Sequence, residues 1–321
     1  MHLSLATEAQ KQQRDRLTHA AWGQTLSVPD FCARELRLRA HPWTARGMQT
    51  WLLTTGAGGA GEVLASCETF HNDSFLRGAG GALEAGDSWS IASVYTEERL
   101  RGRGYATRLM DLVAAHLEGR SPRGHAVVLF SDVGTPLYER SGYRAQDAFD
   151  WVLPPAPGRA GEGVDALVQE AEAPAVLARM RRPDAPFFLW PSAAQVDWHL
   201  ERERIYAQLH ARARPRACGA RVGDASALWA MVSKSNQLVV LMLDAREPAQ
   251  AHALLGAAQR VAHEVGLARV VLWEEPGTAA RVEGVSGARR EAREDSLPML
   301  RPLRPGLPPV QQVPFPRALW V

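Results

Sequence analysis

A Pro- and Gly-rich segment at residues 154–163 divides this chain of 321 residues near its middle. Proline disrupts helix interiors and central strands, so no regular element is expected to continue through this segment. The chain is also longer than the roughly 250–300 residues at which a single hydrophobic core stops growing. We therefore expect two domains, residues 1–153 and residues 164–321, joined by a linker at residues 154–163.

The composition argues against several classes of protein. With 46% hydrophobic and 22% charged residues, the chain is typical of a globular protein. No uncharged apolar run approaches the roughly 18 residues that span a membrane, and the polar N-terminus lacks the apolar stretch of a signal peptide. The net charge of +2 gives no field that would favour nucleic acid. We expect a soluble, cytoplasmic protein that binds neither membranes nor nucleic acids.

The cysteines and the common short motifs narrow the chemistry further. Cys32, Cys67 and Cys218 lie far apart and form no CxxC pair, so neither a disulfide framework nor a structural zinc site is predicted. The HExxH, GK[ST] and GxSxG motifs are absent from the sequence. We therefore expect no metal centre, no P-loop and no hydrolase-type serine nucleophile.

Hydrophobic periodicity predicts a mixture of helices and strands, and hence an α/β fold with mixed sheets. In the second half, the order strand, strand, helix, strand repeats an order found in the first half, although no sequence identity accompanies it. The expected helices lie at residues 8–21, 29–38, 103–117, 135–141, 193–211 and 249–265, and the expected strands at residues 50–54, 63–70, 89–95, 126–130, 143–153, 228–232, 238–243, 269–273 and 317–321.

The most informative segment is the turn that leads from a predicted strand into the helix at residues 103–117. It contains Gly102 and Gly104, each preceded by an arginine, and glycine lets the backbone approach a ligand closely. The helix N-terminus adds unpaired N–H groups and the positive end of a dipole, so the turn predicts a phosphate site. Thr107 stands where a dinucleotide-binding loop would place its third glycine, which disfavours that class. A tight turn with solvated arginines is the simpler alternative.

Here the sequence resembles the GNAT superfamily of N-acetyltransferases. Residues 101–106 resemble the family's Arg-x-x-Gly-x-Gly/Ala signature, and residues 137–143 resemble its Leu-Tyr-x-x-x-Gly-Phe/Tyr segment, in the family's order and separation. The resemblance covers residues 3–153 and implies a GNAT fold with acetyl-CoA as donor. The pyrophosphate would then lie on backbone N–H groups of the turn, and the thioester against the strand end. The implied acetyl-CoA-binding residues are Val94, Tyr95, Thr96, Arg101, Gly102, Arg103, Gly104, Tyr105, Ala106 and Thr107.

A narrower resemblance is to the fungal lysine N6-acetyltransferase type. It rests on residues 67–69, 90–94 and 129–134 together with the long second half. It implies that residues 164–321 form a second, degenerate GNAT-like domain without a pyrophosphate loop. The turn at residues 244–248 agrees, because it contains two acidic residues and no glycine and would repel a phosphate. We therefore expect one cofactor site, in the first half.

The resemblance implies transfer of an acetyl group to the primary amine of a small molecule, for which the side-chain amine of free lysine is one candidate. Two alternatives stay open: acetylation of a protein or peptide amine, and a non-catalytic acyl-CoA sensor. A near-neutral chain with an extra lobe suggests an enclosed pocket, which favours the small molecule. The sequence leaves open whether the second half shapes that pocket or pairs two subunits in a homodimer.

Acetyl transfer to an amine requires proton handling. At pH 7 only about one lysine side chain in 2,500 is neutral, because its pKa is about 10.4. Glu68 is a candidate general base, with an edge carboxylate that faces water as the alternative interpretation. Tyr138, by its position in the family motif, is the candidate acid for the departing thiolate, with a packed aromatic as the alternative.

A free amino acid as acceptor would also require a group that binds its carboxylate. The helix expected at residues 193–211 carries Arg202, whose planar guanidinium could bind a carboxylate in bidentate fashion. The sequence favours a simpler interpretation, a surface helix with ordinary ion pairs such as Glu201 with Arg204. His199 on the same helix is expected to be structural.

Overall fold

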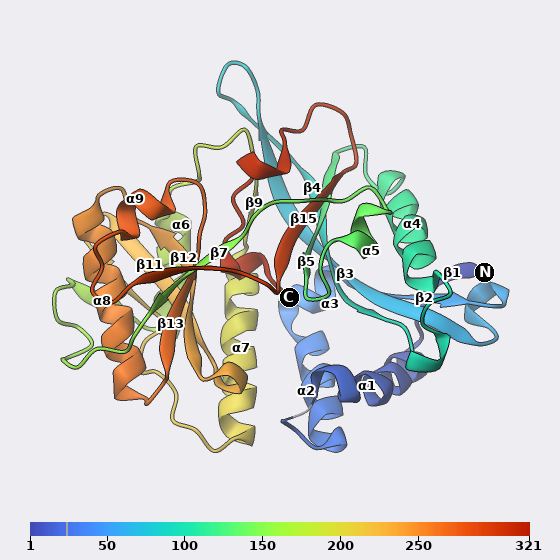
Figure 1. Ribbon diagram of the computed structural model, residues 1–321, viewed down its shortest axis with the longest axis horizontal. Helices are drawn as coiled ribbons and strands as arrows, with labels where there is room; N and C mark the ends of the chain where they lie inside the picture. The colour runs from blue at the N-terminus through green and yellow to red at the C-terminus, as the bar shows by residue number, and fades with distance from the viewer. Residues whose placement is uncertain (24) are drawn as a thin grey trace.

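The first half of the chain is organised around one mixed β-sheet (Figure 1). The computed structural model describes residues 1–23 and 25–321. The strand order is β1-β2-β3-β4-β5-β15-β6, and β9 pairs with the far end of β3. Neighbours are antiparallel except for β4 and β5, which run parallel and are connected through α4. The strands are β1 (His2–Leu5), β2 (Met48–Thr54), β3 (Val63–Arg77), β4 (Leu83–Tyr95), β5 (Gly124–Ser131), β6 (Arg144–Ala145), β9 (Phe187–Trp190) and β15 (Leu297–Pro302).

The second half repeats this plan. Its strand order is β14-β7-β13-β12-β11-β10-β8, and the parallel pair β12 and β13 is connected through α8. Two α/β units, each with one parallel pair bridged by a helix, therefore agree with the fold expected from the sequence. The strands are β7 (Phe149–Leu153), β8 (Ala166–Val168), β10 (Gly219–Val222), β11 (Ala225–Val232), β12 (Gln237–Asp244), β13 (Arg269–Trp273) and β14 (Arg289–Ala292).

The two sheets exchange strands across the Pro- and Gly-rich segment at residues 154–163. The single strand expected at residues 143–153 is wrong: its start forms β6 in the first sheet, and its end forms β7, which pairs with β13 in the second. The physical reason is packing, because Trp151 and Leu153 are buried in the core of the second half. Conversely, β15 follows the second sheet in sequence but pairs with β5 in the first.

The helices cover both faces of the first sheet. α4 packs on one face against Trp51, Cys67 and Leu129, whereas α2, α3 and α7 gather on the other face around Phe70. On this second face, α7 comes from the other half of the chain. The helices are α1 (Glu8–Trp22), α2 (Val28–Ala40), α3 (Pro42–Gly47), α4 (Tyr105–Glu118), α5 (Pro136–Glu139), α6 (Ala173–Arg179), α7 (Ala193–Leu209), α8 (Pro248–Glu264) and α9 (Thr278–Val282).

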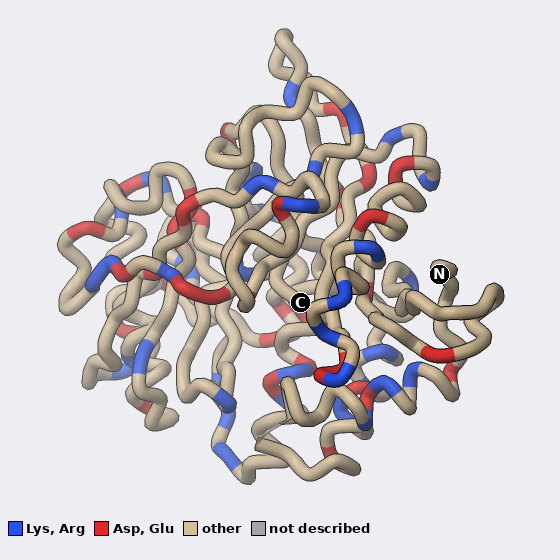
Figure 2. The backbone as a smooth tube through the Cα atoms, turned by 45° about the vertical axis from the view of Figure 1, so that its right-hand side comes forward, with Lys and Arg blue, Asp and Glu red and all other residues tan. Residues whose placement is uncertain are grey.

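Most elements expected from periodicity are confirmed with small shifts at their ends, but β3 and β4 are six to seven residues longer than the strands expected at residues 63–70 and 89–95. The strand expected at residues 317–321 is wrong: the chain forms a short 3-10 helix at Arg317–Leu319, directly after Pro316. In the described part of the chain, no helix is long and apolar enough to cross a membrane. Basic and acidic residues are interspersed along both halves (Figure 2), as the net charge of +2 suggests.

Candidate active site

The first sheet opens between β4 and β5. Their parallel pairing ends at Ile91 with Leu129, although β4 continues to Tyr95 and β5 to Ser131. Beyond this point the two strands are not paired with each other, so a ligand can enter the sheet from this end. Such an opening at the C-terminal ends of parallel strands is a common ligand position in α/β proteins.

A β-bulge in β4 lies at the same place. Ser66 pairs with Tyr95 and Glu68 with Ala92, so two residues of β4, Ser93 and Val94, lie opposite the single Cys67 of β3. Ser93 has a left-handed backbone with φ 54°, which is unusual for a serine. A bulge leaves backbone groups outside the ladder and redirects side chains. The backbone of β4 is therefore irregular where the sheet opens.

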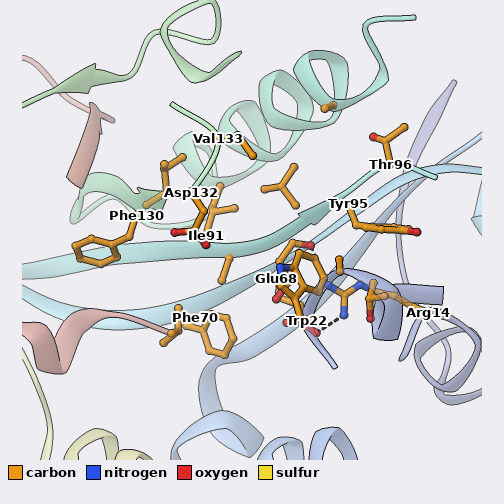
Figure 3. A pocket seen from close by; sticks show the side chains of 18 of the residues that line it. Arg14, Trp22, Glu68, Phe70, Ile91, Tyr95, Thr96, Phe130, Asp132 and Val133 are labelled. Atoms are coloured by element: carbon orange, nitrogen blue, oxygen red, sulfur yellow. Dashed lines mark hydrogen bonds and ion pairs between the residues drawn. The ribbon is translucent and has the colours of Figure 1, made fainter. Parts of the chain in front are cut away.

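A cavity of about 800 Å³ surrounds this opening (Figure 3). It is lined by the middle of β3, by the C-terminal ends of β4 and β5, by α1, α2 and the start of α4, and by Tyr138 from α5. Of the twelve sequence-predicted site residues, only Arg103 is outside this lining. The lining residues expected from the sequence are Glu68, Val94, Tyr95, Thr96, Arg101, Gly102, Gly104, Tyr105, Ala106, Thr107 and Tyr138.

The turn before α4 has the geometry of an anion site. Gly102 and Gly104 both have φ 76°, a conformation that side chains rarely adopt, and a Cβ at either position would meet nothing within 4 Å. Glycine is therefore required by the backbone conformation and not by crowding. Gly104 is the N-cap and supplies no side-chain cap, so the first N–H groups of α4 face the cavity mouth without a capping side chain. Arg101 is exposed beside them, and its Nε donates to the Thr96 carbonyl at 3.1 Å.

Tyr138 lies on α5 with its side chain largely buried. Burial, with a smaller contribution from Asp132, raises the pKa of Tyr138 to about 12. The phenol therefore stays protonated at neutral pH. Within the described part of the chain, the Tyr138 hydroxyl makes no hydrogen bond. Because Tyr138 lines the cavity, this hydroxyl can donate a hydrogen bond to a bound molecule.

Glu68 does not face bulk water, contrary to the alternative considered from sequence. It is 4% exposed on the central strand β3, and its Oε1 accepts from Arg14 Nη1 at 2.8 Å (Figure 3). Burial raises the pKa of Glu68, and the positive charge of Arg14 partly offsets this rise. Cys67 beside it points into the opposite, apolar face, where burial raises the pKa of its thiol to about 12 and leaves it unreactive.

Arg14 is a site residue that the sequence analysis missed. Besides Glu68, its guanidinium donates to Ser66 Oγ at 3.0 Å and to the Ser93 carbonyl at 2.9 Å. It therefore connects the buried carboxylate to the bulge of β4. The sequence of α1 held a signal for this role, because the helix has no continuous apolar stripe and is therefore not expected to pack on a hydrophobic core. The residues that it buries are all polar: Arg14, Asp15 and Thr18.

The second half of the chain also contributes to the cavity. Trp198 and Arg202 from α7, Lys234 and Trp320 line it together with the N-terminal helices. The interpretation of this helix as a surface helix is wrong, because nine of its residues are buried. Its expected ion pair is confirmed at 2.7 Å between Arg204 and Glu201.

His199 is structural, as expected. Its side chain is buried, and its Nε2 lies 3.0 Å from the Ala318 carbonyl. Burial lowers the pKa of His199 to about 3, so the imidazole is neutral and can donate that hydrogen bond. The contact fastens the C-terminal segment to α7 and helps to hold Trp320 at the cavity.

The corresponding turn of the second half has different chemistry. Asp244 at the end of β12 accepts hydrogen bonds from the backbone N–H and the Nε of Arg181, both at 2.9 Å. Glu247 caps α8 in a reciprocal capping box with Gln250. The Glu247 carboxylate therefore already accepts a hydrogen bond from an N–H group at this helix N-terminus. A phosphate would meet two negative charges here.

The matches to known families follow the two halves. Residues 17–143 match the family described as "Acetyltransferase (GNAT) family", and residues 164–313 match the "LYC1 GNAT-like C-terminal domain". A protein named "Lysine acetyltransferase" from Yarrowia lipolytica (strain CLIB 122 / E 150) is 22% identical, and the match covers 80% of each chain.

Solved structures give the same fold. A GCN5-related N-acetyltransferase from Kribbella flavida is 18% identical, with a TM-score of 0.56 over 94% of this chain and 72% of its own. Eis1 from Mycobacterium abscessus is 15% identical, with a TM-score of 0.56 over 94% of this chain and 73% of its own. At these identities the likeness concerns the fold.

The family matches and the opened sheet lead to one assignment. The chain combines a GNAT acetyltransferase domain with a LYC1-like GNAT C-terminal domain and is an N-acetyltransferase of the GNAT kind.

Proposed function

We propose that this enzyme transfers the acetyl group of acetyl-CoA to the primary amine of a small molecule, and that the side-chain amine of free lysine is its acceptor. The observation that carries the proposal is that the uncapped start of α4, the bulge of β4 and side chains of the second half meet in one cavity. An acceptor site built partly by the second half suits a small molecule better than a long peptide. The name of the Yarrowia lipolytica relative supports lysine as the acceptor.

The residues present fit an acyl-CoA donor, which would supply an electrophilic thioester. The N–H groups at the start of α4 and the side chain of Arg101 suit its pyrophosphate. The bulge at Ser93 and Val94 suits the thioester, because backbone groups outside the ladder are available to polarise a carbonyl. The same fit fails at α8, where Asp244 and Glu247 occupy the equivalent position.

Glu68 is proposed to take the proton from the acceptor amine, directly or through one water. Delivering a neutral lysine amine at pH 7 costs about 4.6 kcal/mol, and a nearby base with a raised pKa reduces that cost. Arg14 keeps the carboxylate in place and lowers its pKa relative to burial alone. A dry pocket also disfavours the charged amine. The raised pKa of Glu68 and the desolvation of the amine therefore both favour loss of the amine proton.

Tyr138 is proposed to stabilise the departing thiolate by donating a hydrogen bond. A free thiol has a pKa of about 8.5, whereas the pKa of Tyr138 is about 12. Full proton transfer from the phenol would therefore be uphill by about 4–5 kcal/mol. Donation of a hydrogen bond as negative charge develops on sulfur avoids this cost, and the proton released by the amine can later neutralise the thiolate.

The test is the release of free coenzyme A from acetyl-CoA in the presence of lysine, ornithine, polyamines, aminoglycosides and lysine-containing peptides. The proposal expects the highest kcat/KM for free lysine. A preference for peptides would instead favour the protein acetyltransferase alternative. No turnover across the panel, with acetyl-CoA still bound, would favour an acyl-CoA sensor.

A further inference from the structure

The geometry points to Arg202 as the residue that binds the α-carboxylate of the acceptor, which makes an amino acid the substrate class of this cavity. The inference rests on the proposed function, because it concerns the same site. It depends on three observations: the lack of an acidic partner for Arg202, the aromatic side chains beside it, and the apolar path from it to Glu68.

Arg202 differs from the other arginines that helices bring to the cavity. Arg14 pairs with Glu68, Arg39 pairs with Asp15 at 2.6 Å, and Arg34 pairs with Glu35. For Arg202 no carboxylate in the described part of the chain lies within the 4.0 Å of an ion pair. Glu35 acts on Arg202 only from beyond that distance. A partly buried guanidinium without a direct ion-pair partner is unfavourable, and an anionic ligand bound to it would offset that cost.

Aromatic rings fix the guanidinium of Arg202. Its Cζ lies 4.6 Å from the ring centroid of Trp320 and 5.7 Å from that of Tyr206. Tyr206 is itself held, because its hydroxyl accepts a hydrogen bond from Arg34. A guanidinium stacked against rings keeps its planar edge available, and this edge matches the two oxygens of a carboxylate.

An apolar path connects Arg202 to the proposed base. Glu68 and Phe70 are two residues apart on β3, so they share one face of the sheet. Phe70 packs with Trp198 and Leu38 in one hydrophobic cluster, and all three side chains line the cavity. Trp198 and Arg202 are four residues apart on α7 and therefore share a helix face. The cavity thus offers a base, an apolar segment and a cation in that order, which matches the amine, methylene chain and carboxylate of lysine.

The experiment compares acceptors first with the unaltered enzyme. Lysine and lysinamide differ only in the carboxylate, so steady-state kinetics with each measure its contribution. A site built to hydrogen-bond a substrate group strongly rejects an analogue without it, and we expect kcat/KM for lysinamide to be about 100-fold lower than for lysine. No substitution is needed, so a folding defect cannot obscure the result.

The variant R202M then tests the residue itself. We expect its kcat/KM for lysine to fall about 100-fold to the level of lysinamide, while its kcat/KM for lysinamide and its KM for acetyl-CoA change less than about threefold. R202K should recover part of the lysine activity, since it keeps the charge but loses the bidentate fork. R204M is the matched control: it removes an arginine from the same helix that is paired to Glu201 and does not line the cavity.

The outcomes separate the two claims. If the enzyme uses lysine and lysinamide equally well, the proposed function stands and the role of Arg202 is wrong. The role is also wrong if R202M reduces activity with lysine and lysinamide to the same extent. If the unaltered enzyme acetylates no free amine, the proposed function fails and the inference fails with it.

Discussion

Arg14 of α1 and Glu68 of β3 form a buried ion pair, with Arg14 Nη1 2.8 Å from Glu68 Oε1 and both side chains 6% exposed. The same guanidinium binds the carbonyl of Ser93 at the bulge of β4. One side chain thus holds both the proposed base and the backbone beside which the thioester is proposed to lie. This links the N-terminal helix, which has no part in the recognised motifs, to the chemistry of the site.

Replacement of Arg14 by methionine should destabilise the protein and impair catalysis. It leaves a buried carboxylate without its counter-charge, which costs about 3–5 kcal/mol of folding free energy. Urea unfolding measures this change. R16M, an exposed position on the same helix, is the control and should change the free energy of unfolding by less than about 0.5 kcal/mol. A loss for R14M no larger than that of R16M would contradict the structural role of the pair.

The pH dependence of kcat/KM should report on Glu68. A general base is active when ionised, so activity falls as pH drops below its pKa, which burial raises above 4.5. E68Q should lower kcat/KM by about 10²-fold and abolish this acidic limb. R14M should move the limb to higher pH, because loss of the positive charge raises the pKa of Glu68 further. An unchanged limb in E68Q would exclude Glu68 as the base.

Removal of the Tyr138 hydroxyl should affect turnover and not donor binding. Y138F loses the only atom that can donate to the leaving sulfur from this side chain, so we expect kcat to fall about 10²-fold with little change in the affinity for acetyl-CoA. Y143F is the matched control, since the hydroxyl of Tyr143 is buried, has no hydrogen-bond partner in the described part of the chain and lies outside the cavity. Equal turnover of Y138F and the unaltered enzyme would refute the role.

The glycine turn can be tested through coenzyme A affinity. G104A forces a side chain into φ 76°, at a cost of about 1–2 kcal/mol that relaxation of the turn would relieve by moving the N–H groups of α4. We expect the Kd for coenzyme A, measured by calorimetry, to rise about tenfold. G80A is the control, because Gly80 lies in a surface turn without a positive φ and its Cβ would meet nothing. An unchanged Kd in G104A would argue against an anion site at this turn.

The parts of the site that depend on local sequence signals could be predicted from the sequence. The turn with Gly102 and Gly104 and the segment around Tyr138 combine short-range backbone requirements with a family motif, and the structure brings them to one cavity. The helices around them follow from periodicity, which depends on neighbours three and four residues apart.

The features that could not be predicted from the sequence depend on contacts between residues that are far apart in the chain. β7 and β15 each join the sheet whose core buries one of their side chains, Trp151 for β7 and Met299 for β15. The local sequence of neither strand indicates which strand it pairs with. For a similar reason, the sequence did not point to Arg14 and favoured a solvent-exposed position for Arg202. A charged residue on a helix is usually solvated, and only the packing of α1 and α7 against the sheet turns these two toward the cavity.

The most direct test of the account is to identify the product formed from acetyl-CoA and free lysine. Mass spectrometry and NMR of the reaction mixture should show one acetyl group on the side-chain nitrogen of lysine for each coenzyme A released. Absence of acetyl-lysine while coenzyme A binding is retained, or acetylation confined to lysines within peptides, would contradict the account.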